Sequence, residues 1–122
     1  MPFTNQILVS ERIVLTVASG VMSDQMAIAN QKVIAEHPDF DPAFDQIADL
    51  TGVSRVEITH DGLNQLSMNS PFLPSSRRAF IITNSESADK LGIFFKSTVL
   101  QSEGVLVTKD REEAYRWLLD RP

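Results

Sequence analysis

The chain has 122 residues, of which 43% are hydrophobic, so we expect one globular domain, residues 1–122, built around a single core. Its formal net charge of −5 makes nucleic acid a poor partner, and the absence of cysteine excludes thiol catalysis, thiolate metal sites and disulfides. No apolar run approaches the roughly 20 residues that a membrane span requires, and the N-terminus does not resemble a signal peptide, so we expect a cytoplasmic protein.

The chain begins with two apolar stretches, QILVS (6–10) and RIVLTV (12–17), which predict a short β-hairpin. We expect Gly20 to end the second strand. Ser23 is typical of a helix N-cap, and apolar residues follow it at helical spacing. These residues are Met26, Ala29 and Val33. Pro38 cannot continue a helix, so this helix is predicted to end near His37.

A stretch rich in proline and aspartate, HPDFDPAFDQ, predicts turns before the next strand. We expect that strand over Phe44–Leu50, short and partly buried. Thr51 and Gly52 are then predicted to break it.

Two residues compete as the N-cap of the next helix. Ser54 with Glu57 fits a capping box, whereas Thr59 is flanked by residues suited to a hydrophobic staple. We favour Thr59, because the residues before it alternate like extended chain and those after it recur at helical spacing. The residues that carry this pattern are Val56, Ile58, Leu63 and Leu66.

The segment SPFLPSS predicts a loop, and AFIIT after it predicts a central strand buried on both faces. Farther along, Ala88, Leu91 and Phe95 mark an amphipathic helix that continues toward Leu100. A last strand, VLV, is predicted after Gly104.

The final helix has the clearest local signals. Asp110 and Glu113 form a capping box, and Ala114, Trp117 and Leu118 make one apolar face. The whole order is then β-β-α-β-α-β-α-β-α. Alternating helices and strands imply parallel pairing with right-handed crossovers, and the opening hairpin adds one antiparallel edge. We therefore expect an α/β fold in which a mixed sheet of about five strands is covered by about four helices.

This order and several short motifs resemble the SpoIIAA-like fold, which STAS domains share with a group of small STAS/SEC14-type proteins. The motifs extend over nearly the whole chain: G-x-x-S (20–23), DLTGV (49–53), ITHDGL (58–63), RRAFIIT (77–83), VLVTKD (105–110) and EEAYRWL (112–118). The ending D-x-E-E-A-x-x-W-L resembles small uncharacterised SpoIIAA-like proteins more than true anti-sigma antagonists. The resemblance implies a domain of interaction and regulation.

In the anti-sigma factor antagonists of this fold, a serine in the stretch D-S-S-G-L accepts phosphate from a partner kinase at the start of a helix. The corresponding stretch here is THDGL (59–63), in which Asp61 occupies the place of the acceptor serine. A serine kinase cannot switch an aspartate, whose charge is already in place. The resemblance therefore implies a regulatory domain that lacks the phosphorylatable serine. Its candidate regulatory or binding loop comprises Asp49, Thr51, Thr59, His60 and Asp61.

The same residues also fit ordinary structural roles. Thr59 suits an N-cap, Asp61 a first-turn acid and Asp49 a turn at the end of a strand. Neither His37 nor His60 has the spacing of a metal site, and no nucleophile-elbow, dinucleotide or phosphate-loop motif occurs. We predict no enzymatic activity, no cofactor and no metal.

Leu91, Phe94 and Phe95 are candidates for an apolar ligand surface, as the SEC14-type relatives suggest, or for a dimer surface. Two function classes remain open. The first is a non-enzymatic, homodimeric interaction module with a protein partner or small ligand. The second is a carrier or sensor of a small apolar, lipid-like molecule. A hydrolase with a scattered active site is a third alternative.

Overall fold

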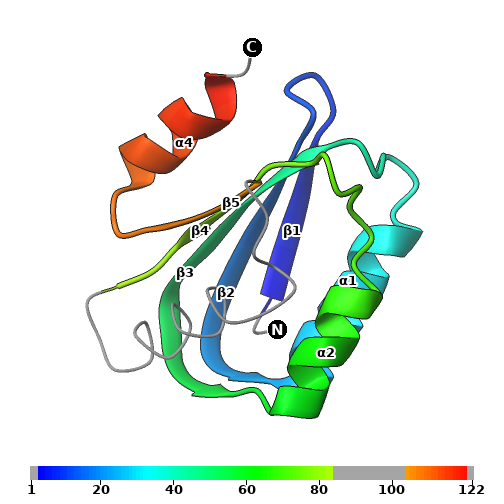
Figure 1. The fold of residues 1–122 in the computed structure, drawn as a ribbon, viewed down its shortest axis with the longest axis vertical. Helices are drawn as coiled ribbons and strands as arrows, with labels where there is room; N and C mark the ends of the chain where they lie inside the picture. Colours follow the sequence, from blue (N-terminus) through cyan, green and yellow to red (C-terminus); the bar gives the residue numbers. More distant parts are fainter. Residues whose placement is uncertain (1–2, 84–103, 121–122) are drawn as a thin grey trace.

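The computed structural model describes residues 3–83 and 104–120, in which helices pack on a single five-stranded sheet (Figure 1). In sheet order the strands are β1 (Phe3–Leu8), β2 (Ile13–Ser23), β3 (Asp45–Glu57), β4 (Arg78–Ile81) and β5 (Val105–Thr108). The helices of the described part are α1 (Asp24–Glu36), α2 (His60–Met68) and α4 (Arg111–Leu119). The helix predicted from Ala88 toward Leu100 lies outside the described residues.

The pairing of the strands confirms the predicted mixed sheet. β1 is antiparallel to β2, with Leu8 opposite Ile13 next to the turn. The pairs β2–β3, β3–β4 and β4–β5 are all parallel, and an α-helix connects β2 to β3 and β3 to β4. β4 lies between β3 and β5, as expected for the central strand AFIIT.

Two predicted strand ends are wrong, because β2 and β3 are longer than the sequence indicated. β2 passes Gly20 and ends at Ser23, and β3 passes Thr51 and Gly52 and ends at Glu57. Their pairing shifts register near both glycines, and Gly20 takes a positive φ of 72°. Glycine inside a strand often marks such an irregularity. A side chain at position 52 would press on the backbone of the neighbouring strand. The glycines thus permit a bulge rather than a stop.

The predicted helix starts are confirmed at the side-chain level. The Ser23 hydroxyl accepts a hydrogen bond from Met26 N, and the Thr59 hydroxyl accepts one from Gly62 N. The Asp110 carboxylate accepts a bond from Glu112 N at the start of α4. Each side chain satisfies an amide that has no partner within its own helix. The helix predicted to stop near His37 does end there, with His37 as C-cap.

Successive residues of a strand point to opposite sides of the sheet, so each face carries side chains that can pack against a helix. Both faces are covered in this way. α1 and α2 lie together on one face and α4 lies on the other (Figure 1). Under α4, strand residues pack with the predicted apolar face of that helix: Ile13, Ile47, Ala79 and Ile81 with Ala114, Trp117 and Leu118. The expected packing of Trp117 on the sheet is therefore confirmed.

Within the described part of the chain, no helix has the length and apolar character needed to cross a membrane.

Candidate functional site

The N-termini of α1 and α2 meet at one edge of the sheet. β2 and β3 are parallel neighbours, with Ser23 opposite Glu57 where the two strands end. A helix follows each strand at once or after two residues, so both helices begin at the same edge. Helix N-termini present free amides and a partial positive charge, which makes such a place favourable for an anion.

The carboxylate of Asp24, the first residue of α1, occupies this place. Its Oδ1 accepts a hydrogen bond from Thr59 N at 2.8 Å, and its Oδ2 accepts one from the Thr59 hydroxyl at 2.5 Å. The Thr59 oxygen accepts in turn from Gly62 N at 3.0 Å. A β-carbon on Gly62 would overlap the Asp24 carboxylate. Glycine at position 62 therefore leaves the room that this carboxylate fills.

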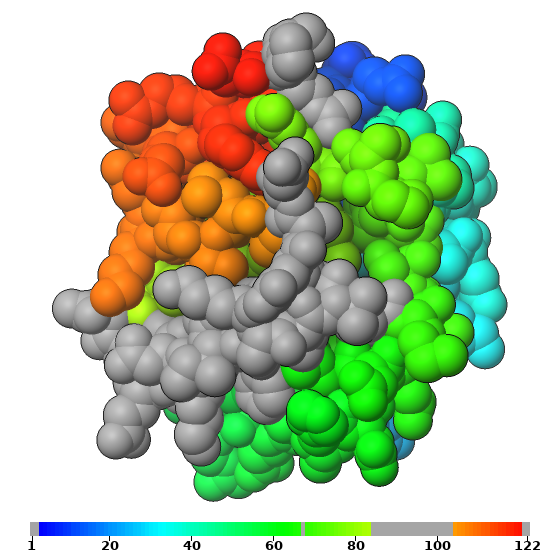
Figure 2. All heavy atoms as spheres, viewed as in Figure 1, coloured from blue at the N-terminus to red at the C-terminus, as the bar shows by residue number. Residues whose placement is uncertain are grey.

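His60 and Asp61 lie beside this contact at the surface of α2, which is green in Figure 2. Both residues are exposed. Asp61 belongs to the first turn of α2, but no hydrogen bond joins its carboxylate to any described residue. The anion held at the start of α2 is thus Asp24 rather than the first-turn acid that the sequence pointed to.

Asp49 and Thr51 do not join this site. Both belong to the middle of β3, and the Asp49 side chain is almost entirely buried beside α4. Asp49 Oδ1 accepts from Thr51 N at 3.0 Å and from the Thr51 hydroxyl at 2.6 Å, while Oδ2 pairs with Arg111 at 2.6 Å. Eight residues of strand at about 3.3 Å each separate Asp49 from the end of β3. Thr59, His60 and Asp61 lie beyond that end, in a separate place.

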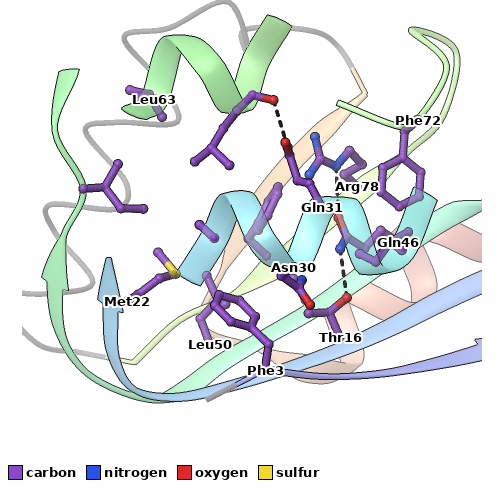
Figure 3. Close-up of a pocket in the computed structure, with 16 residues that line it drawn as sticks. Phe3, Thr16, Met22, Asn30, Gln31, Gln46, Leu50, Leu63, Phe72 and Arg78 are labelled. Carbon is purple, nitrogen blue, oxygen red and sulfur yellow. Dashed lines mark hydrogen bonds between the residues drawn. The ribbon is translucent and has the colours of Figure 1, made fainter. Parts of the chain in front are cut away.

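A cavity of about 90 Å³ lies between the sheet and helices α1 and α2 (Figure 3). Its lining is mainly apolar and comes from strands and helices alike, with Met22, Ala48, Leu50 and Phe80 from the sheet and Ala27, Ile34, Leu63 and Leu66 from the helices. The predicted apolar residues Leu91, Phe94 and Phe95 lie outside the described part of the chain.

A row of polar side chains crosses the same face of the sheet and borders the cavity. Arg78 Nε donates to Gln46 Oε1 at 3.0 Å, and Gln46 Nε2 donates to the Thr16 hydroxyl at 2.9 Å (Figure 3). The Thr16 hydroxyl donates to Asn5 Oδ1 at 2.8 Å, and Asn5 Nδ2 donates to Asn30 of α1. Each member donates to the next, and the row begins at a cation. Fully bonded polar rows rigidify a core, whereas partly bonded ones are costly.

The sequence carries signals for these groups. Asp24 directly follows an N-cap serine. Acidic residues are common at this position, so Asp24 by itself does not indicate a site. Thr16, Gln46 and Arg78 occupy alternate, inward positions of apolar strands, and a polar residue at such a position requires a partner. Among residues 3–83 and 104–120, no three His, Asp or Glu side chains gather as metal ligands would.

No protein-family model matches the chain, and no curated protein matches it in sequence. Two solved structures are similar over nearly their whole lengths. The anti-sigma factor antagonist SpoIIAA in its unphosphorylated form matches with a TM-score of 0.55 and 12% identity, over 98% of this chain and 99% of that one. An uncharacterized DUF3478-family protein with a SpoIIAA-like fold, from Shewanella loihica PV-4, matches with a TM-score of 0.50 and 16% identity, over 95% and 91% of the two chains. The chain has a SpoIIAA-like fold.

Proposed function

We propose that the chain is a cytoplasmic, non-enzymatic regulatory domain of the STAS type, which recognises a protein partner through the start of α2 and works without phosphorylation. The observation that carries this proposal is the carboxylate of Asp24, bonded to Thr59 N and Oγ1 at the helix start. The fold supplies the comparison, because in the anti-sigma antagonists the same helix start carries the serine that accepts phosphate.

Thr59 is a poor phosphate acceptor for a geometric reason. Its hydroxyl donates to Asp24 and accepts from Gly62 N, so both of its hydrogen-bonding roles are in use. A phosphate on this oxygen would lie against the Asp24 carboxylate, and two anions at that distance repel each other. The neighbouring Asp61 offers no hydroxyl. The helix start therefore holds a fixed negative charge instead of a switchable one.

The partner surface consists of the exposed residues around this contact, His60 and Asp61. Tagged wild-type protein should capture a partner from extracts of its own cells. The variant Asp61→Lys should lose that partner, because it reverses one exposed charge without touching the Asp24–Thr59 contact. Asp39→Lys, the same reversal at an exposed residue in the loop after α1, is the matched control. A partner that binds all three proteins equally would contradict recognition through this surface.

We also propose that the domain is a homodimer. Val17 and Val21 of β2 are 42% and 39% exposed, and β1, beside β2, is one of the two edge strands of the sheet in the described part of the chain. Apolar side chains beside an open strand edge favour association. Native mass spectrometry should give twice the chain mass for the wild type and a monomer for Val17→Lys, and a monomeric wild type would refute the dimer.

A second candidate function is a carrier or sensor of a small apolar molecule. The observation that favours it is the cavity of about 90 Å³ between the sheet and helices α1 and α2, which is lined mainly by apolar side chains. Apolar pockets with a few well-placed polar groups are typical of ligand sites. Native mass spectra of freshly purified protein should then contain, beside the ligand-free species, one that is heavier by the mass of a small molecule and disappears on denaturation. Spectra without such a small-molecule adduct would oppose this candidate and leave the first untouched.

A further inference from the structure

We propose that the cavity under α1 and α2 binds a small organic carboxylate, and that the guanidinium of Arg78 receives the carboxylate group. This inference rests on the second candidate function and names its ligand class. It is independent of the proposal for the start of α2.

Unlike Arg111 and Arg55, Arg78 has no anionic partner among the described residues. Arg111 pairs with Asp49 and Arg55 pairs with Glu57, but no carboxylate of the described residues lies within ion-pairing distance of Arg78. The single hydrogen bond of its side chain among these residues goes from Nε to Gln46 Oε1. The two terminal nitrogens, with four N–H donors, make no hydrogen bond within the described part of the chain.

The surroundings of Arg78 favour the binding of an anion to its guanidinium group. The guanidinium lies 5.0 Å from the ring of Phe72 and 5.3 Å from that of Phe80, and both rings line the cavity. Burial lowers the pKa of Arg78 below the usual value for arginine, to about 10, so the group remains charged at neutral pH. The side chain keeps some exposed surface, so its loss of hydration is partial. A cation held among aromatic rings gains most from a carboxylate, whose two oxygens match the guanidinium fork.

Gln46 and Thr16, the next members of the polar row, cannot take the place of an anionic partner for Arg78. Gln46 is 4% exposed and uses its oxygen for Arg78 and its nitrogen for Thr16. The Thr16 hydroxyl is bonded on both sides as well. This row fixes the Nε side of Arg78, and its terminal nitrogens are left for a ligand in the cavity (Figure 3).

The cavity size limits the ligand to a short acid. The cavity has a volume of about 90 Å³. An engineered apolar cavity of about 150 Å³ is known to hold benzene, so a ligand here must be smaller than an aromatic acid. An acid of two to four carbons, such as butyrate, suits the volume.

The test is a titration of the ¹⁵N-labelled full-length protein followed by NMR. Butyrate is compared with butyramide, which has the same shape and no charge, and sodium chloride at equal ionic strength controls for unspecific anion effects. Butyrate should move the amide signals of the cavity residues saturably and should bind at least about tenfold more tightly than butyramide. The guanidinium signals of Arg78 in the wild type should move with butyrate alone, which requires no variant.

Arg78→Gln should weaken butyrate binding by about ten- to a hundredfold, the usual range for a charge-assisted hydrogen bond, and leave butyramide binding unchanged. Arg55→Gln, at an exposed arginine of β3, should bind both compounds as the wild type does. Equal binding of the acid and the amide, with no shift of the Arg78 guanidinium signals, would overturn the carboxylate inference. The apolar carrier would not be affected by that result. If the wild type binds neither compound, the carboxylate inference is refuted, and the native mass spectra described above decide separately on the apolar carrier.

Discussion

The position of the Asp24 carboxylate over Gly62 leads to a prediction about stability. Gly62→Ala should destabilise the protein when position 24 is aspartate and stabilise it when position 24 is alanine. In the wild type a β-carbon on residue 62 overlaps the carboxylate, which must then leave Thr59. In the background Asp24→Ala there is no carboxylate to displace. Alanine is then simply the better helix former at a position inside α2.

The magnitudes follow from the contacts that are lost or gained. Asp24 accepts two hydrogen bonds at an exposed helix start, so Asp24→Ala should lower the free energy of unfolding by about 1–2 kcal/mol. Gly62→Ala in the wild type loses the same contact and gains about 0.5–1 kcal/mol of helix propensity, a net loss of about 1 kcal/mol. In the Asp24→Ala background it should stabilise by about 0.5–1 kcal/mol.

Urea unfolding curves of the four proteins measure this cycle, provided that the slope m is unchanged among them. Asp61→Ala is the matched control, because Asp61 is an exposed acid of the same turn and contributes at most the helix-dipole term of about 0.3–1 kcal/mol. If Gly62→Ala has the same sign in both backgrounds, the carboxylate of Asp24 does not lie over Gly62. The reasoning about the start of α2 would then fail.

Substitutions at three positions, Thr59, Trp117 and Arg78, give further tests of the structure by thermal or urea unfolding. Thr59→Ala should cost about 1–2 kcal/mol and Thr59→Ser little, and equal losses would show that the hydroxyl is not the cap. Trp117→Ala should cost about 2–3 kcal/mol, less than a fully buried tryptophan, since it is partly exposed but packs on the sheet and under Arg77; an unchanged melting temperature would show that α4 is not docked. Arg78→Met should change the free energy of unfolding by less than about 1 kcal/mol at pH 7. Below a pH of about 10 the guanidinium is charged and its burial carries a desolvation cost. Methionine removes this cost and also removes the hydrogen bond to Gln46, so the two effects oppose each other. A loss above about 3 kcal/mol would make Arg78 structural rather than a ligand group.

The sequence was sufficient for the order of the elements that the structure describes, because each helix start among them had a local chemical cause. Ser23, Thr59 and Asp110 cap their helices through side chains that the sequence displays. The strand ends were less predictable. Gly20 and Gly52 stop a strand when nothing else intervenes, but pairing with a neighbouring strand carried both strands through a bulge.

The candidate site was only partly predictable, because its contacts join residues that are distant in sequence. Asp24 and Thr59 are 35 positions apart, so no short motif contains them both. Arg78 and Gln46 are 32 positions apart and meet only because β3 and β4 pair in one register. The sequence predicts Asp49 and Thr51 in one loop with Thr59, yet the continued strand leaves both far from its end, where Asp49 pairs with Arg111 of α4.

The most direct test of the central claim, a helix start with a fixed carboxylate and no phosphate switch, is an intact-mass measurement. Wild type, Asp61→Ser and the double variant Asp61→Ser/Thr59→Val are each incubated with an anti-sigma-type kinase and ATP. We predict that the wild type keeps its mass, whereas Asp61→Ser and the double variant each gain one phosphate, on the serine introduced at position 61. A phosphate on Thr59 of the wild type would contradict the claim, since the Asp24 carboxylate would then have yielded its place to a phosphate.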